Sequence, residues 1–131
     1  MIERILVAVD DSAPALGAAA FAVELAAQVA AELRFVTVSS DGDDPEVMLR
    51  HVDAAAEQAG ITTSTEVLTT TGQPFESILD LAVVWDADVI VMGRSDRRTT
   101  GRPYVGSQTE HLLEFTDVPV LVVPTSARAP S

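Results

Sequence analysis

Short apolar runs alternate with longer mixed stretches along the whole chain. Runs such as ILVAV and VLVV are continuous and too short for helices, which is typical of strands buried on both faces. The longer stretches are rich in alanine and space their apolar residues as a helix does. The pattern predicts strands at residues 5–9, 33–39, 62–70, 88–93 and 119–123. It predicts helices at residues 13–31, 45–59, 73–84 and 107–114.

The predicted strands and helices follow one another in strict alternation. Such a chain favours a parallel sheet with helices on both faces, a doubly wound three-layer α/β sandwich. Helix-end signals agree, because Ser12 can cap a helix, Pro14 and Pro74 fall in first turns, and Gly60 follows a predicted helix end. From 131 residues we expect one domain at residues 1–124 and a disordered tail at 125–131.

The net charge of the chain limits the classes of molecule that can bind it. The net charge is -12, and all eight basic residues are arginine. The field of so acidic a protein repels nucleic acid and anionic membranes, although a small anion could still bind at a locally positive spot. Salt adaptation and a GC-rich genome account equally well for the acidity and the missing lysine.

The absence of cysteine excludes disulfides, thiolate metal sites and a cysteine nucleophile. The N-terminal segment MIERILVAVDD has an apolar run of only five residues that ends in two acids, so it predicts neither a secretory signal nor a membrane span. We therefore expect a cytoplasmic protein with no membrane partner.

Candidate ligand-binding residues follow two of the buried strands. Ligands of open parallel sheets bind outside the carboxyl ends of the strands, where the strand order reverses. If the first and fourth strands are neighbours, Asp10, Asp11 and Gly93 meet in one crevice there. An acidic pair at this place is also typical of phosphorelay receiver domains. Those domains need an aspartate after the third strand and a lysine after the fifth, and this chain has neither.

The segment MGRSDRRTTGRPYVGSQTEHLL, which begins at Met92, indicates an anion site. Gly106 and Ser107 open the predicted helix, whose free N–H groups and positive dipole end attract phosphate. Four of the eight arginines in the chain lie inside this segment, over a span of nine positions: Arg94, Arg97, Arg98 and Arg102. Arginines in such a cluster can bind phosphate bidentately, or they can pair with surface carboxylates in an ordinary solvated loop. Both interpretations stay open.

The whole chain from ILVAVDDS to VPVLVVP resembles a universal stress protein domain. Members of that family that bind ATP carry glycine, two residues, glycine, nine residues, and then glycine followed by serine or threonine. Gly93, Gly106 and Ser107 match this spacing, but Asp96 stands at the second glycine position. An aspartate there brings a side chain and a negative charge toward a triphosphate, and both weaken ATP binding.

The family resemblance also assigns roles to further positions of this sequence and implies an oligomeric state. Asp10 matches the aspartate that meets the ribose and base, and Val38 matches the residue that meets adenine, whereas Asp11 replaces the usual glycine. The resemblance implies a Rossmann-like five-stranded parallel sheet of order 3-2-1-4-5. It also implies a homodimer paired through the last strand, from Pro119 to Val123, and an uncharged apolar edge of that kind is normally covered or paired.

The sequence thus predicts regulatory binding of an adenine nucleotide, ATP or AMP, in a stress response, with Mg²⁺ accompanying ATP and no intrinsic metal. The predicted nucleotide-binding residues are Asp10, Val38, Gly93, Arg94, Arg97, Arg98, Gly106 and Ser107. Two alternatives remain: Asp10 is only a helix cap, or the protein is a nucleotide-free dimeric interaction module whose site Asp11 and Asp96 have closed.

Catalysis is not expected from this set of residues. His51 and His111 fall on predicted helices without partners at metal-ligand or triad spacing, which favours surface histidines. Ser107 has no base near it in the sequence, which favours a helix cap over a nucleophile. No general base for water is evident either, so any nucleotide hydrolysis would be slow. Of the two single large aromatics, Trp85 is expected to pack at a helix end, and Tyr104 could cover a ligand.

Overall fold

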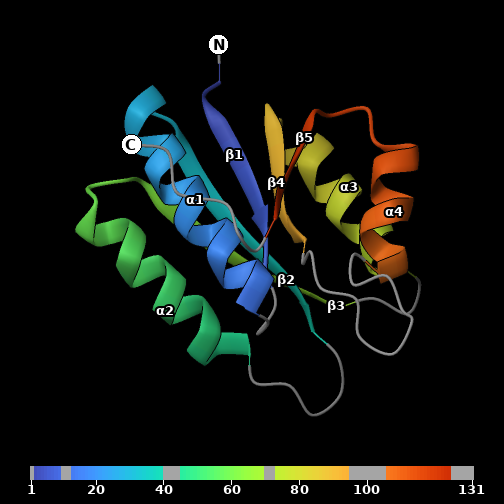
Figure 1. Cartoon of the computed structure of the whole chain (residues 1–131), viewed down its shortest axis with the longest axis horizontal. Helices are drawn as coiled ribbons and strands as arrows, with labels where there is room; N and C mark the ends of the chain where they lie inside the picture. The colour runs from blue at the N-terminus through green and yellow to red at the C-terminus, as the bar shows by residue number, and fades with distance from the viewer. Residues whose placement is uncertain (1, 10–12, 40–44, 70–72, 95–105, 125–131) are drawn as a thin grey trace.

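A computed structural model of the chain describes residues 2–9, 13–39, 45–69, 73–94 and 106–124. A parallel sheet lies between two layers of helices, with α1 and α2 on one face and α3 and α4 on the other (Figure 1). The strands are β1 Arg4–Ala8, β2 Glu32–Ser39, β3 Thr63–Thr69, β4 Val89–Arg94 and β5 Val120–Pro124. The helices are α1 Ala13–Val29, α2 Pro45–Gln58, α3 Pro74–Trp85 and α4 Gly106–Phe115.

The strand order is β3-β2-β1-β4-β5, and every neighbouring pair is parallel. This confirms the predicted doubly wound α/β fold and the order implied by the family resemblance. The order reverses between β1 and β4, because the chain first builds the sheet outward from β1 to β3 and then crosses over to β4. All strands therefore end at one edge of the sheet, called here the carboxyl edge, and begin at the opposite, amino edge.

Alternate strand residues fill two separate cores. Ile5 and Val7 of β1 face α1 and α2, together with Phe35 of β2, while Leu6 and Val36 face α3 and α4. Side chains of a strand point to opposite faces in turn, so a central strand covered by helices on both faces must be apolar at every position. This requirement explains the continuous runs ILVAV and VIVM in the sequence.

Every predicted helix and strand is present, with its ends within two residues of the prediction. The largest shift is at the end of α1, which stops at Val29 because Ala30 adopts a left-handed conformation, with φ 58°. The Ala31 amide then donates to the Ala26 carbonyl at 3.1 Å. Asp86 ends α3 in the same conformation, with φ 62°. Glycine usually takes this position, so the left-handed residues that end the two helices were not predicted from the sequence.

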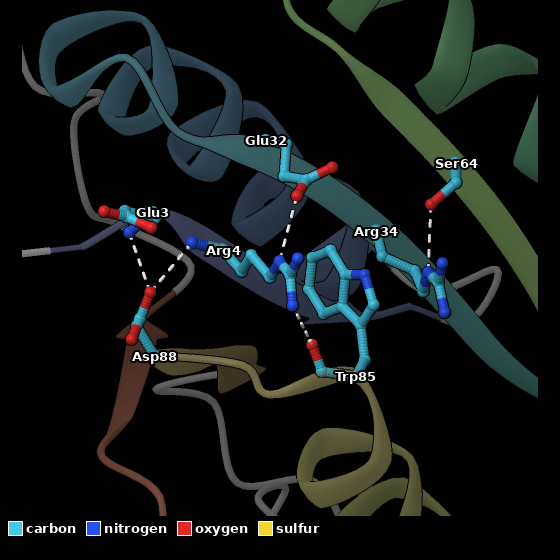
Figure 2. Close-up of polar contacts among 7 residues, drawn as sticks. All are labelled: Glu3, Arg4, Glu32, Arg34, Ser64, Trp85 and Asp88. Carbon is cyan, nitrogen blue, oxygen red and sulfur yellow. Dashed lines mark hydrogen bonds and ion pairs between the residues drawn. The ribbon is translucent and has the colours of Figure 1, made fainter.

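The amino edge is closed by stacked side chains from three elements. Figure 2 shows Trp85, at the end of α3, between the guanidinium groups of Arg4 and Arg34, which lie 5.8 and 4.8 Å from its ring centre. Arg4 also donates to the Trp85 carbonyl at 2.8 Å and to Glu32 at 3.0 Å, and Arg34 donates to Ser64 at 2.9 Å. Trp85 packs at a helix end, and both arginines fix its position.

Asp88 holds the start of β1 at the same edge. One of its carboxylate oxygens accepts the backbone amides of Glu3, at 2.8 Å, and Arg4, at 3.0 Å (Figure 2). These two hydrogen bonds stabilise the ionised carboxylate and lower the pKa of Asp88 below its ordinary value of 3.8. A carboxyl group with a lowered pKa stabilises the fold above its ordinary pKa, and this contribution disappears as the pH falls through the lowered value.

Replacing Asp88 with asparagine should therefore lower the free energy of unfolding at pH 7, because the neutral amide is a weaker acceptor for the two backbone N–H groups. The difference from the unchanged protein should shrink as the pH falls below 3.8. Urea unfolding at a series of pH values measures it. Asp80→Asn removes the same charge from an exposed side chain and is the control. A difference that persists undiminished at the lowest pH would contradict the role given to the Asp88 charge.

Candidate functional site

The strands β1 and β4 stop pairing before either of them ends. Their shared ladder runs only to Val7 and Val91. Beyond that level β1 continues to pair with β2 for one more residue, and β4 continues with β5 as far as Arg94 and Pro124. The strands β1 and β4 therefore separate at the carboxyl edge, at the point where the strand order reverses. Open parallel sheets bind their ligands at such a point.

An apolar shelf lies beside this point, formed by Ala8 of β1, Val38 of β2 and Leu68 of β3. All three side chains pack against the core under α3 and α4, yet each remains partly exposed. Val38 and Leu68 are register partners on neighbouring strands, so their side chains lie next to each other on one face. A shelf of small aliphatic groups suits the flat face of a heterocyclic base. Val38 was predicted from the sequence as a binding residue, whereas Ala8 and Leu68 were not.

The helix α4 begins at the same edge. It connects two parallel strands, β4 and β5, so it runs back from the carboxyl edge toward the amino edge (Figure 1). Its first residues are Gly106 and Ser107, one residue earlier than predicted. Thr109 and Leu112 are buried and anchor the helix on the sheet. The free N–H groups of the first turn and the positive end of the helix dipole thus lie at the carboxyl edge, where they favour an anion.

Part of the predicted nucleotide site falls within the described residues. Val38 and Gly93 lie at the ends of β2 and β4, and Arg94 is the last residue of β4. Gly106 and Ser107 form the start of α4, so these five positions share the carboxyl edge. The remaining predicted residues, and the others singled out in the same segments, lie outside the described residues: Asp10, Asp11, Asp96, Arg97, Arg98, Arg102 and Tyr104. Their roles stay predictions.

The two histidines differ in their surroundings. His51 is exposed on α2, as expected for a surface histidine. His111 meets the expectation of a surface histidine only in part: it is partly buried, and its ring centre lies 5.2 Å from that of Phe75 in α3. Its Nδ1 atom is buried and has no hydrogen-bond partner in the described part of the chain. This contact could not be predicted from the sequence, because the two residues lie on different helices.

Within the described residues, no group of three or more histidine, aspartate or glutamate side chains is placed to hold a metal ion. Among the helices of the same residues, none has the length and apolar character needed to cross a membrane.

Comparison with known proteins gives one family. The model of the universal stress protein family matches residues 1–124. A universal stress protein of Methanocaldococcus jannaschii is 28% identical over 142 residues, which cover 94% of this chain and 82% of that protein. A crystal structure of a universal stress family protein from Burkholderia pseudomallei is 28% identical, with a TM-score of 0.73, and the match covers 94% of this chain and 96% of that one.

A third similar protein carries a ligand in its structure. The universal stress protein of Archaeoglobus fulgidus, solved in complex with dAMP, is 24% identical to this chain, with a TM-score of 0.75. The match covers 94% of this chain and 99% of that one. This likeness shows a shared fold.

Replacing His111 with leucine removes a buried nitrogen that has no partner among the described residues and keeps an apolar group against Phe75. We expect the free energy of unfolding to stay unchanged or to rise by about 1 kcal/mol, because a buried unsatisfied polar atom costs stability. Urea unfolding measures the change. His51→Leu, at an exposed position, is the control and should shift stability by no more than about 0.5 kcal/mol. A clear loss of stability in the His111 variant alone would mean that its Nδ1 makes a stabilising interaction.

Proposed function

The chain belongs to the universal stress protein family, and we propose that it binds an adenine nucleotide, ATP or AMP, as a regulatory ligand at the carboxyl edge of its sheet. One observation carries this proposal: the apolar shelf of Ala8, Val38 and Leu68 and the start of α4 lie at the same edge, beside the point where β1 and β4 part. The shelf suits a base, and the helix start suits a phosphate. The dAMP complex of the similar Archaeoglobus fulgidus protein supports the same ligand class.

In this proposal each part of the nucleotide meets a different chemistry. Adenine rests on Val38 and its neighbours in the shelf, because contact between aliphatic side chains and the face of a flat ring removes apolar surface from water. Asp10 follows β1 and accepts hydrogen bonds from the ribose. The phosphates approach the backbone at Gly93 and the free amides of Gly106 and Ser107 at the start of α4.

The arginines of the segment that joins β4 to α4 complete the phosphate site. Arg94, Arg97 and Arg98 supply guanidinium groups that bind phosphate oxygens bidentately. They also offset the charge of Asp96, which stands where ATP-binding members of the family carry glycine. The arginine side chains thus replace the backbone contacts to phosphate that a glycine at this position would allow. The affinity for the nucleotide then depends on the salt concentration.

Binding acts as a signal in this proposal and drives no chemistry. No side chain is proposed as a general base, so nucleotide turnover is at most slow, and Mg²⁺ enters only with ATP. The ligand changes the conformation of the segment between β4 and α4 through its contacts with the arginines, and a partner in a cytoplasmic stress response reads that change.

Calorimetric titration with ATP and AMP, with and without Mg²⁺ and at low and high salt, tests the proposal. We expect saturable binding that weakens as salt rises, since arginine–phosphate contacts are screened. Val38→Asp should reduce the affinity at least about tenfold, because it places a charge against the base. Val47→Asp, an equal change at an exposed position on α2, is the control. No heat up to millimolar nucleotide would contradict the proposal and favour the nucleotide-free module.

Asp96→Gly separates the two accounts of the altered site. A repaired site, in which the arginines already hold the phosphates, should gain little affinity from the added glycine. An affinity that rises steeply from nothing would instead mark a site that Asp96 had disabled.

We also propose a homodimer formed through β5. This strand is an edge of the sheet, and its residues Val120, Leu121 and Val122 are each partly exposed in the single chain. An edge strand offers unpaired N–H and C=O groups, and an apolar edge without charge is normally covered.

Sedimentation velocity of Val122→Lys measures this pairing. The lysine should shift the protein toward monomer, because two like charges would meet across a twofold axis. Val47→Lys, on the exposed side of α2, should leave the mass unchanged. A monomeric parent protein, or a dimer that tolerates the Val122 change, would overturn the proposed pairing.

A further inference from the structure

The outer surface of α3 and α4 carries most of the exposed apolar side chains in the described residues. Seven large apolar side chains are exposed among the described residues, and four of these seven belong to α3 and α4: Val83, Val84, Leu113 and Phe115. Val84 is 84% exposed and Phe115 is 59% exposed. Single exposed apolar residues are ordinary on a protein surface, so these four matter here only where they adjoin a groove.

A shallow groove of about 330 Å³ lies between the two helices. Its lining residues are Phe75, Glu76, Leu79, Asp80 and Phe115. The rings of Phe75 and Phe115 stack with their centres 5.8 Å apart and their planes tilted by 15°. The floor of the groove is therefore a preformed aromatic surface, which can receive an apolar side chain without first becoming ordered.

The side of the groove formed by α3 is acidic. Glu76 and Asp80 are exposed, and neither makes an ion pair within the described residues. They stand four residues apart, and Val84 follows at the same interval, so the three side chains lie along one face of α3. The net charge of -12 adds a long-range attraction for cations. The charge pattern thus complements a basic partner with apolar groups on both sides of its charges.

We infer that the groove between α3 and α4 docks a basic amphipathic protein segment. An aromatic or aliphatic side chain of the partner rests on Phe75 and Phe115, its Lys or Arg residues face Glu76 and Asp80, and a second apolar side chain covers Val84. This is the pattern by which an amphipathic helix binds a hydrophobic groove. None of the residues that line the groove is proposed to bind the nucleotide, so this inference does not rest on the proposed nucleotide site.

A synthetic helical peptide of leucine and lysine, labelled with a fluorophore, probes the groove by fluorescence anisotropy at about physiological salt. The pair Glu76→Gln and Asp80→Asn should weaken binding about tenfold, because two facing charges are lost. Phe115→Ser should weaken it by a similar factor, because the aromatic anchor is removed. Matched controls lie on the other helix layer, and they should bind the peptide as the parent protein does: the pair Glu24→Gln and Glu57→Gln, and Val47→Ser, whose side chain is 59% exposed like that of Phe115.

Four results would overturn the inference. Equal weakening in the control pair, or equal binding of a lysine–serine peptide, would mean that net charge alone attracts the peptide. Absence of binding would remove the proposed partner class. Conversion of a dimeric protein to monomer by Phe115→Ser, measured by sedimentation velocity, would assign the groove to a second copy of this chain.

Discussion

The burial of a parallel sheet on both faces is the constraint on which the rest of this structure depends. It requires apolar residues at every position of the central strands, and Leu6, Val7, Ile90 and Val91 meet that requirement with no exposed surface. It also requires a helix between each pair of strands, so that every strand ends at the same edge. The edge that gathers the strand ends and the helix starts is therefore a consequence of the core.

The two edges of the sheet have different properties. At the amino edge, Trp85 lies between Arg4 and Arg34, and Asp88 accepts two backbone amides, so polar and aromatic contacts tie β1, β2 and α3 together (Figure 2). At the carboxyl edge, β1 and β4 separate, and the shelf around Val38 remains partly exposed. The contacts at the amino edge support the fold, and the carboxyl edge is where we propose that the nucleotide binds.

Local pattern was enough to predict the helices, the strands and the fold class. The strand order came from the family resemblance, because no local pattern states which strands are neighbours. The left-handed residues Ala30 and Asp86 were missed because the sequence has no glycine there. Contacts between distant segments were missed for a different reason: Arg4 and Trp85 are 81 positions apart, and nothing in either neighbourhood encodes their meeting.

The candidate site was predictable only in part for the same reason. The spacing of Gly93, Gly106 and Ser107 could be matched along the chain, and Val38 could be placed by resemblance. Ala8 and Leu68 join Val38 only through strand pairing, so they emerged with the structure. The roles of Asp10, Asp96 and the arginines stay predictions.

A two-dimensional ¹H–¹⁵N NMR titration of the isotopically labelled protein with AMP tests directly whether a nucleotide binds at the carboxyl edge. We expect saturable shifts of the backbone amides of Val38, Leu68, Gly93 and Ser107 at the carboxyl edge, with the Trp85 indole signal at the amino edge unchanged. Absence of shifts at millimolar AMP, or shifts confined to other surfaces, would contradict the proposed nucleotide site.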